Sequence, residues 1–444
     1  MFHLKRYREC LEDIQFAIES GYPEASCHKL YDRQGSCYIE LGNPTEAEAS
    51  FTLAQNSLAA ANLDEKTHKS WLRALTKQLG RCKQIVAKPY SGSGVKSERT
   101  IPPCITGEAS ATHLNASAKV RVLYNNVAGR HIVAGQDIKI GDVLVVDRPF
   151  ATVLFPCFYK THCYHCFAQV SVPIPCLQCC TIVFCSRQCR DASWTKFHQY
   201  ECQFFALLDT STCAKIGHLA IRLLMVLGLS HALEYLKRRE EQVSPSPELV
   251  GINGDGIYCS DYDSIYDMAT HSDHRPSDQL FDFSIVSCLL MKVLQLSGYV
   301  QLAEDSHDFA LLGGLLLRHL QIIQCNALRV IELQRPGRFD DLKPGELGIG
   351  LYPTAALVNH SCDPSADLNF YGDSVVVRAI RNINQDEEVA ISYGPLFYES
   401  KAGPRQTQLK GAYFFSCRCD LTLYIFIYIA PFSSAENQKS RKWF

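Results

Sequence analysis

The sequence lacks a long apolar run near its C-terminus. The longest apolar run near the C-terminus, Leu421 to Phe432, has about a dozen residues, whereas a membrane-spanning helix needs about 20. The start, Met1 to Arg6, has no apolar core of the kind that secretory signal peptides carry. We therefore expect no transmembrane segment and a reducing rather than an extracellular environment.

The chain also has no excess of charge of either sign, because its formal net charge is −2 over 444 residues. A balanced chain has no general attraction to nucleic acid or to anionic membranes. The basic stretch Lys237 to Arg239 is followed at once by two glutamates and is too short for a strong nuclear signal. We expect no direct contact with nucleic acid or membrane.

Cysteine is abundant, with 21 residues, and part of it is spaced like metal ligands. A gap of two residues lets a tight turn present both thiolates to one zinc ion, which prefers four tetrahedral ligands. Four pairs follow one another: two have this gap, Cys163 with Cys166 and Cys176 with Cys179, and two have a gap of three residues, Cys185 with Cys189 and His198 with Cys202. They predict a module with two closed zinc sites, since scattered core thiols would match four spacings only by chance. A helix should follow Cys185, with Ser186 as its N-cap.

Residues 1–87 predict helices of the tetratricopeptide type. The small and aromatic positions of such a repeat are matched by Tyr31, Gly35, Tyr38, Ala47, Phe51 and Ala54. Leu41 to Pro44 would form the turn between two helices. An ordinary helical hairpin has the same alternation of small and large residues and stays as the alternative. Repeats of this kind form concave surfaces, so the predicted role is to bind a peptide or protein partner.

The remaining pattern predicts an α+β protein of several domains. Strand-like alternation begins at Lys119 and runs to Val146, helical spacing covers Leu219 to Leu236 and Phe309 to Leu333, and strands return after Leu347. The predicted segments are 1–87 helical repeats, 88–118 linker, 119–162 first β part, 163–202 zinc module, 203–334 helical insert, 335–399 second β part, 400–419 cysteine-containing segment and 420–444 atypical tail.

Four strings of residues follow one another in the last third of the chain: Gly350–Pro353, Asn359–Pro364, Ile391–Pro395 and Tyr413–Cys419. They resemble the SET domain of protein lysine methyltransferases. With the zinc module after the first β part, the chain resembles the SET-and-MYND family, and most of all its fourth member, the subclass with N-terminal tetratricopeptide repeats. The resemblance implies a β-rich SET domain that is split by a double-zinc MYND insert and by a helical insert, with residues 400–419 as a post-SET segment.

This resemblance implies an enzyme that transfers a methyl group from S-adenosylmethionine to a lysine of a histone or non-histone protein. It implies action in the nucleus and cytoplasm and a role in transcriptional repression. Tyr393 and Tyr413 match the catalytic tyrosine and the second aromatic residue of the lysine channel. The cofactor-binding residues that it implies are Gly129, Arg130, Asn326, Asn359, His360, Tyr393 and Phe415. Judged by its local sequence alone, Tyr393 could also be an ordinary strand tyrosine, and Asn326 a helix cap.

The sequence departs from the family at two places. His131 stands where the second glycine of a Gly-x-Gly turn is expected, and histidine adopts a left-handed backbone less readily, so we expect weaker binding of the methyl donor. The family's third zinc site corresponds to Cys362, Cys417 and Cys419, but Thr422 replaces its last cysteine. We therefore expect an incomplete third site in a truncated form of the family's chain.

A second hypothesis is a non-catalytic scaffold. The family resemblance implies that the MYND module binds proline-containing peptides of co-repressors, while the helical repeats bind another partner. It also implies an interleaved pairing of zinc ligands, the first pair with the third and the second with the fourth. Cys180, beside Cys179, is a competing thiol. Direct DNA binding by the module is disfavoured because few basic residues accompany it.

Overall fold

The computed structural model describes residues 1–84, 101–210, 214–241, 245–334 and 343–419. By their contacts these residues divide into two compact units, the first consisting of residues 1–84 with 169–174 and the second of all the others. Residues 85–100 of the predicted linker and the predicted tail 420–444 lie outside the described part.

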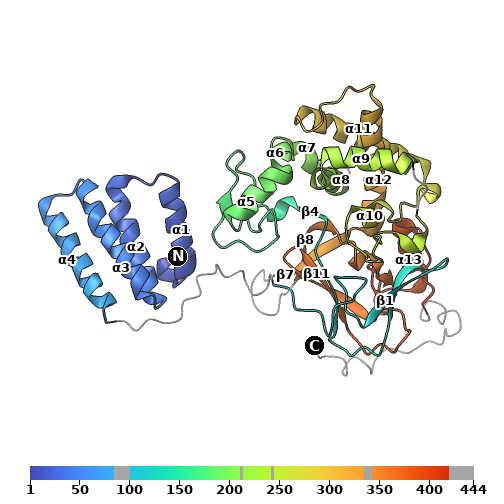
Figure 1. Ribbon diagram of the computed structural model, residues 1–444, viewed down its shortest axis with the longest axis horizontal. Helices are drawn as coiled ribbons and strands as arrows, with labels where there is room; N and C mark the ends of the chain where they lie inside the picture. The colour runs from blue at the N-terminus through green and yellow to red at the C-terminus, as the bar shows by residue number, and fades with distance from the viewer. Residues whose placement is uncertain (85–100, 211–213, 242–244, 335–342, 420–444) are drawn as a thin grey trace. The chain divides into compact units, whose positions relative to one another are not determined.

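The first unit is built of helices (Figure 1). Asn43 begins one of them by accepting the Glu46 N–H at 3.3 Å, and Pro44 occupies its first turn. The helix pair joined near Leu41 agrees with the predicted turn. The bounds are α1 Tyr7–Glu19, α2 Cys27–Glu40, α3 Pro44–Ser57 and α4 Glu65–Cys82.

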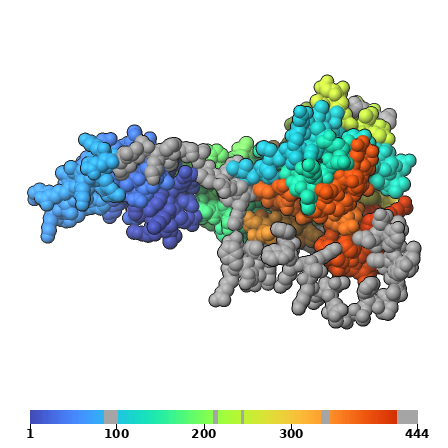
Figure 2. Space-filling model, turned by 90° about the horizontal axis from the view of Figure 1, so that it is seen from below, coloured from blue at the N-terminus to red at the C-terminus, as the bar shows by residue number. Residues whose placement is uncertain are grey.

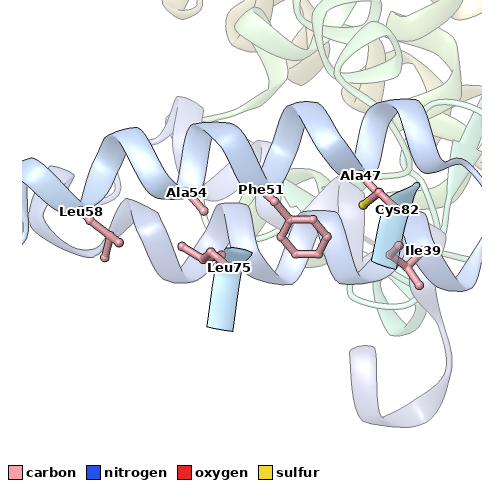
Figure 3. Close-up of a cluster of buried hydrophobic side chains, with 7 residues drawn as sticks. All are labelled: Ile39, Ala47, Phe51, Ala54, Leu58, Leu75 and Cys82. Atoms are coloured by element: carbon pink, nitrogen blue, oxygen red, sulfur yellow. The ribbon is translucent and has the colours of Figure 1, made fainter. Parts of the chain in front are cut away.

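The core of this unit lies between α2, α3 and α4 (Figure 3). A Cβ built on Gly35 of α2 would lie 2.6 Å from the ring of Phe51 on α3, so a glycine is needed for this close packing. The sequence match at Gly35 and Phe51 therefore reflects a real contact, while the identity of the repeat remains a prediction. The buried cluster contains Ile39, Ala47, Phe51, Ala54, Leu58, Leu75 and Cys82.

The second unit contains short strands and a set of helices that gather on one side of them (Figure 1). The strands are β1 Val120–Asn125, β2 Gly129–Ala134, β3 Val143–Asp147, β4 Ala151–Leu154, β6 Val183–Phe184, β7 Leu328–Gln334, β8 Lys343–Leu351, β9 Asn359–His360, β10 Ala366–Tyr371, β11 Ser374–Ala379 and β12 Ala390–Ile391; β5, Ile174–Pro175, precedes β6. The helices are α5 Arg187–Ser193, α6 Gln199–Glu201, α7 Phe205–Thr210, α8 Ala214–Leu227, α9 Leu229–Glu241, α10 Tyr262–Tyr266, α11 Ser277–Leu296, α12 His307–Asn326 and α13 Ala402–Tyr413.

Strands from before and after the helical insert pair with each other. The antiparallel sheet β10–β11–β3 joins Asp147 to Val375, and the sheet β4–β8–β7 joins Ala151 to Leu351. Figure 2 shows the early residues of this unit (cyan) beside its late residues (orange to red). The two β parts predicted from the sequence thus form one folded region, which the zinc module and the helices interrupt along the chain.

Two segments differ from the prediction. The helix predicted over Phe309 to Leu333 ends at Asn326, and Leu328–Gln334 is strand β7, because these apolar residues pair with β8. Residues 101–118 of the predicted linker pack on the second unit: Ser117 is fully buried and its N–H donates to the Leu144 carbonyl at 2.8 Å. Small polar residues there satisfy backbone groups of β3, which a search for large apolar residues overlooks.

Helix α11 is long and apolar enough to cross a membrane by length and composition, and a third (33%) of its most apolar window is buried. The bent pair Lys215–Leu227 and Leu229–Glu241 passes the same test as one broken span. The sequence analysis predicted no such segment. One or two helices of this kind are weak evidence for a membrane span, because the core helix of a soluble protein has the same properties.

Replacement of Gly35 by alanine should loosen the first unit. The added Cβ has to push against the Phe51 ring, and overpacking of this kind costs about 1–3 kcal/mol. Hydrogen exchange of the full chain, followed by mass spectrometry, should show faster exchange across α2 and α3. Gly80→Ala in α4 is the control, because nothing lies within 4 Å of the new Cβ. Equal protection in both variants would contradict the packing described for Gly35.

Candidate active site and metal centres

A cavity of about 1090 Å³ lies in the second unit between β2, β9, the segment after β12, and the end of α13. A volume of this size suits a ligand as large as a nucleotide cofactor together with part of a second substrate. Every residue predicted to be catalytic or to bind the cofactor lines it: Gly129, Arg130, Asn326, Asn359, His360, Tyr393, Tyr413 and Phe415. Five separate stretches of the sequence therefore meet at one cavity.

The parallel pairing of β9 with β12 brings two of these stretches together. Asn359 lies beside Ala390, and His360 beside Ile391. Just beyond this pair, the Tyr393 N–H donates to His360 Nδ1 at 3.0 Å. This bond requires Nδ1 to be the unprotonated ring nitrogen, so the neutral ring carries its proton on Nε2. Burial, followed by the charge of Arg405, lowers the pKa of His360 to about 4.

Aromatic rings form one wall of the cavity. The ring centroids of Tyr393 and Tyr413 are 5.0 Å apart, and the Phe415 ring lies 6.2 Å from that of Tyr393. The Tyr393 hydroxyl donates to the Val358 carbonyl at 2.9 Å, and the Tyr413 hydroxyl donates to the Tyr393 carbonyl at 3.2 Å. Burial raises the pKa of both phenols. Both tyrosines are therefore neutral at physiological pH and act as hydrogen-bonding, largely apolar walls.

Two asparagines at the cavity use their amide hydrogens within the protein. Asn359 donates to the Ala128 carbonyl at 3.0 Å and to Glu388 Oε1 at 3.2 Å. Asn326 donates to the carbonyls of Ala269 at 2.9 Å and Ile322 at 2.8 Å, which is the helix-end role that the sequence left open. In each case the side-chain oxygen is the group left to accept a bond from a ligand.

The turn into β2 supplies backbone rather than side-chain chemistry. Gly129 has a φ of +67°, which glycine adopts without strain. Arg130 donates from Nη1 to the Val250 carbonyl at 3.2 Å. His131 is buried in β2 and is not among the residues with positive φ. The prediction of a left-handed backbone at His131 is therefore wrong. The expectation of weaker binding of the methyl donor rested on that prediction and loses its basis.

The buried carboxylate of Asp147 positions the segment that leads into β9. Asp147 Oδ2 accepts the N–H groups of Thr354 and Ala355 at 2.7 and 2.9 Å, and Oδ1 accepts from Asn115 Nδ2 at 2.9 Å. These two N–H groups begin the short 3₁₀ helix η9, Ala355–Leu357. Burial raises the pKa of Asp147 to about 6, although the hydrogen bonds oppose this shift.

The eight ligands predicted for the zinc module form two groups of four. Within each group the ligand atoms lie within 4.8 Å of one another. The grouping of the side chains follows the interleaved order that the resemblance implied, and Cys180 belongs to neither group. The groups are Cys163, Cys166, Cys185 and Cys189, and Cys176, Cys179, His198 and Cys202.

The geometry of both groups fits a tetrahedral metal ion. Three sulfur–sulfur separations in the first group are 3.6, 3.5 and 3.9 Å, and sulfurs about 2.3 Å from a zinc ion would be about 3.8 Å apart. In the second group, His198 Nε2 lies 3.2 and 3.6 Å from the sulfurs of Cys176 and Cys179. The predicted helix begins at Arg187, and Ser186 caps it by accepting the Cys189 N–H at 3.1 Å.

A buried charge network connects the metal-binding module to the sheets. Arg222 of α8 donates to Glu201 Oε1 at 2.9 Å and to the Thr152 carbonyl of β4 at 2.7 Å. Glu201 precedes the ligand Cys202, and it also accepts from Tyr164, which lies between Cys163 and Cys166, at 3.0 Å. Burial opposes ionisation of Glu201, but Arg222 and His218 hold the pKa of this carboxyl well below its usual value.

The third predicted metal site is different. The ligand atoms that lie within 4.8 Å of one another belong to His360, Cys362 and Cys417, whereas Cys419 packs beside them. Arg405 Nε, on a buried and permanently charged guanidinium, lies 3.3 Å from Cys362 Sγ. The protonated Nε2 of His360 lies 3.4 Å from the same sulfur. His360 cannot ligate a metal through this protonated nitrogen, so the group offers the thiols of Cys362 and Cys417, fewer than the four protein ligands of a structural zinc site.

Three residues of this region were not found by sequence reasoning. Glu388 holds Asn359, Asp147 holds η9, and Arg405 contacts Cys362. Each acts through a partner far away in the chain, so no local spacing could identify it. The sequence offered one indication: Glu388 and Arg405 lie in segments next to the motifs that resemble the SET domain.

Comparison with known proteins agrees with this geometry. The SET domain family matches residues 129–394. Protein-lysine N-methyltransferase SMYD4 of Mus musculus is 26% identical over 487 residues, covering 94% of this chain and 60% of that protein, and SMYD4 of Gallus gallus is 25% identical over 465 residues, covering 89% and 62%. Histone-lysine N-methyltransferase ASHR1 of Arabidopsis thaliana is 26% identical over 291 residues, covering 66% and 52%. The chain thus spans about 60% of the length of the first relatives that it matches.

Replacement of Arg222 by leucine should destabilise the second unit strongly. It leaves the fully buried Glu201 without its guanidinium partner, and breaking a buried pair in this way costs about 3–5 kcal/mol. The double variant Glu201→Leu/Arg222→Leu should regain part of this loss, because no buried charge is then unpaired. Chemical denaturation of the full chain measures the free energy of unfolding of the single and the double variant. Lys292→Leu is the control, because its ion pair with Glu304 is exposed and contributes at most about 1 kcal/mol. A loss for Arg222→Leu as small as the control's would contradict this account.

Proposed function

The chain belongs to the SET domain family, which matches more than half of it, and on this premise we propose that it is a protein-lysine N-methyltransferase that uses S-adenosylmethionine. The observation that carries the proposal is the convergence of Asn359, His360, Tyr393, Tyr413 and Phe415 on one cavity. The names of the similar proteins support the same reaction class.

The residues present fit the proposed cofactor. Adenine needs an aromatic or apolar surface, which Phe415 provides, and an amino-acid group needs hydrogen-bond acceptors and charged groups. Asn359 offers a free acceptor oxygen, and Arg130 and Glu388 bring charges of both signs to the same cavity. When bound, S-adenosylmethionine would supply an electrophilic methyl group on a positively charged sulfur.

In this proposal the protein mainly orients the acceptor amine and excludes water. Alignment of two reactants in a closed site can supply about 7–11 kcal/mol of the barrier reduction. Tyr393 and Tyr413 stay protonated, so they direct hydrogen bonds rather than take up the amine's proton. The aromatic wall lowers the polarity around the amine, which favours its neutral, nucleophilic form. The substrate is proposed to be a lysine of a histone or non-histone protein.

We also propose that the two groups of four ligands bind zinc and that they shape the module rather than react. Each group has four protein ligands and no open position, which is typical of structural zinc sites. Binding of proline-containing peptides by this module, and of a further partner by the N-terminal helices, remains part of the proposal.

Tyr393→Phe should abolish most of the methyl transfer and leave cofactor binding largely intact. Loss of the hydroxyl removes an orienting hydrogen bond, and groups that act directly on the reacting atoms contribute about 10²–10⁴-fold. Labelled S-adenosylmethionine with histone and non-histone protein mixtures measures transfer, and calorimetry with S-adenosylhomocysteine measures binding. Tyr398→Phe, a change on an exposed side chain (68%), is the matched control.

The outcome separates the two hypotheses. A wild-type chain that neither transfers methyl groups nor binds S-adenosylhomocysteine is not a methyltransferase. A chain that binds protein partners while Tyr393→Phe changes none of its cellular effects is a scaffold.

Metal analysis of the purified full chain should give about two zinc ions per molecule. Cys166→Ser should remove one of them, because it breaks the first group of four ligands. Cys362→Ser should change the zinc content little, because among the described residues only Cys362 and Cys417 offer ligand atoms there while His360 Nε2 is protonated. A content near three, falling to two in Cys362→Ser, would show an intact third site.

A further inference from the structure

Four carboxylates line the cavity, and among the described residues Glu388 and Asp363 form no ion pair; of these two, Glu388 accepts a hydrogen bond from Asn359. The neighbouring Glu387 also lines the cavity, but Arg381 lies 2.6 Å from its Oε1, and the Asn384 N–H donates to its Oε2 at 3.0 Å. Asp267 is likewise paired, with Arg239 at 2.7 Å. Within the described part of the chain, no lysine, arginine or histidine lies within 4.0 Å of the Glu388 carboxylate.

The bond from Asn359 to Glu388 fixes which way the amide faces. Asn359 Nδ2 lies between two groups that only accept hydrogen bonds, the Ala128 carbonyl and the Glu388 carboxylate. An amide with oxygen and nitrogen exchanged would place its oxygen against both acceptors. The orientation is therefore determined by its partners, and Oδ1 is the acceptor that remains for a ligand.

The backbone position of Glu388 places it beside β2. Its backbone pairs with Val133 of β2, next to the turn at Gly129. After burial and Tyr413, its charge is a further cause of the raised pKa of Tyr393. The side chain is exposed and lines the cavity, where no ion pair with it is described.

These contacts point to a cationic ligand group. The methyl donor carries an α-ammonium group on its amino-acid end, and ammonium binds best to a carboxylate and to carbonyl oxygens. We propose that Glu388 is a positioning residue for this end of the methyl donor: it holds the Asn359 amide so that its oxygen accepts from the α-ammonium group, and it supplies the negative charge that attracts this group. The inference rests on the proposed function.

Calorimetry on the full chain tests the role of Glu388 with two ligands. S-adenosylhomocysteine has the amino-acid end, whereas 5′-methylthioadenosine has the nucleoside and sulfur without it. Glu388→Ala should lower the affinity for S-adenosylhomocysteine by about tenfold, which is the effect expected for the loss of one hydrogen bond to a charged group. Glu388→Gln keeps an acceptor for Asn359, so its affinity for S-adenosylhomocysteine should fall only about threefold. The affinity for 5′-methylthioadenosine should change less than about twofold in both variants, which also shows that the cavity is still folded.

Glu387→Ala is the matched control and should affect neither ligand. In turnover, Glu388→Ala should raise the KM for S-adenosylmethionine and leave kcat at saturating cofactor almost unchanged. Equal weakening of both ligands, or unchanged binding of S-adenosylhomocysteine by Glu388→Ala, would overturn the assignment while the proposed function stands. A wild-type chain that binds neither ligand would overturn both.

Discussion

The buried carboxylate of Asp147 connects the two halves of the SET region, and the candidate site depends on it. An ionised carboxylate is costly to bury, and burial raises the pKa of Asp147 to about 6. Because this value lies above the usual one, the stability that the group contributes is complete below its ordinary pKa and is lost as the pH rises through about 6. The group is nevertheless needed at this place, since the N–H groups of Thr354 and Ala355 would otherwise be buried without a partner. The turn that they begin leads directly into Asn359 and His360.

Local spacing in the sequence allowed much of the fold and of the candidate site to be predicted. The features that were missed depend on tertiary contacts. The zinc-type ligands could be found because a metal ion requires fixed short gaps, and Ser186 because a cap acts within one turn. Leu328–Gln334 was wrongly predicted as helix, because a short apolar run has no period that separates a strand from a buried helix, and only its pairing with β8 decides. Residues 101–118 were predicted as linker because they have few large apolar side chains, but Ser117 is buried through backbone bonds. Glu388 and Arg405 could not be identified by local spacing, since their partners lie tens of residues away.

The metal-type clusters show that the same residue types can serve different purposes. In each of the two groups of the inserted module, the ligand atoms lie at separations that suit one metal ion. Arg222 and Glu201 connect the module to β4 and α8. Beside the cavity, Cys362 is contacted instead by a guanidinium and by an imidazole N–H. There a cation that belongs to the protein occupies the place next to the sulfur, and His360 keeps the tautomer that its bond to Tyr393 requires. The same histidine cannot hold that bond and ligate a metal through Nε2 at the same time.

The two ends of the cavity need opposite electrostatics if the reaction is methyl transfer to lysine. The acceptor amine must be neutral, so it needs an apolar surrounding and neutral hydroxyls, as Tyr393 and Tyr413 provide. A carboxylate beside that amine would favour its protonated form and slow the reaction. The amino-acid end of the methyl donor carries an ammonium group at neutral pH, which a carboxylate stabilises. Glu388 is hydrogen-bonded to Asn359 and to neither tyrosine, so the proposal assigns its charge to the end of the site where a positive group has to be held.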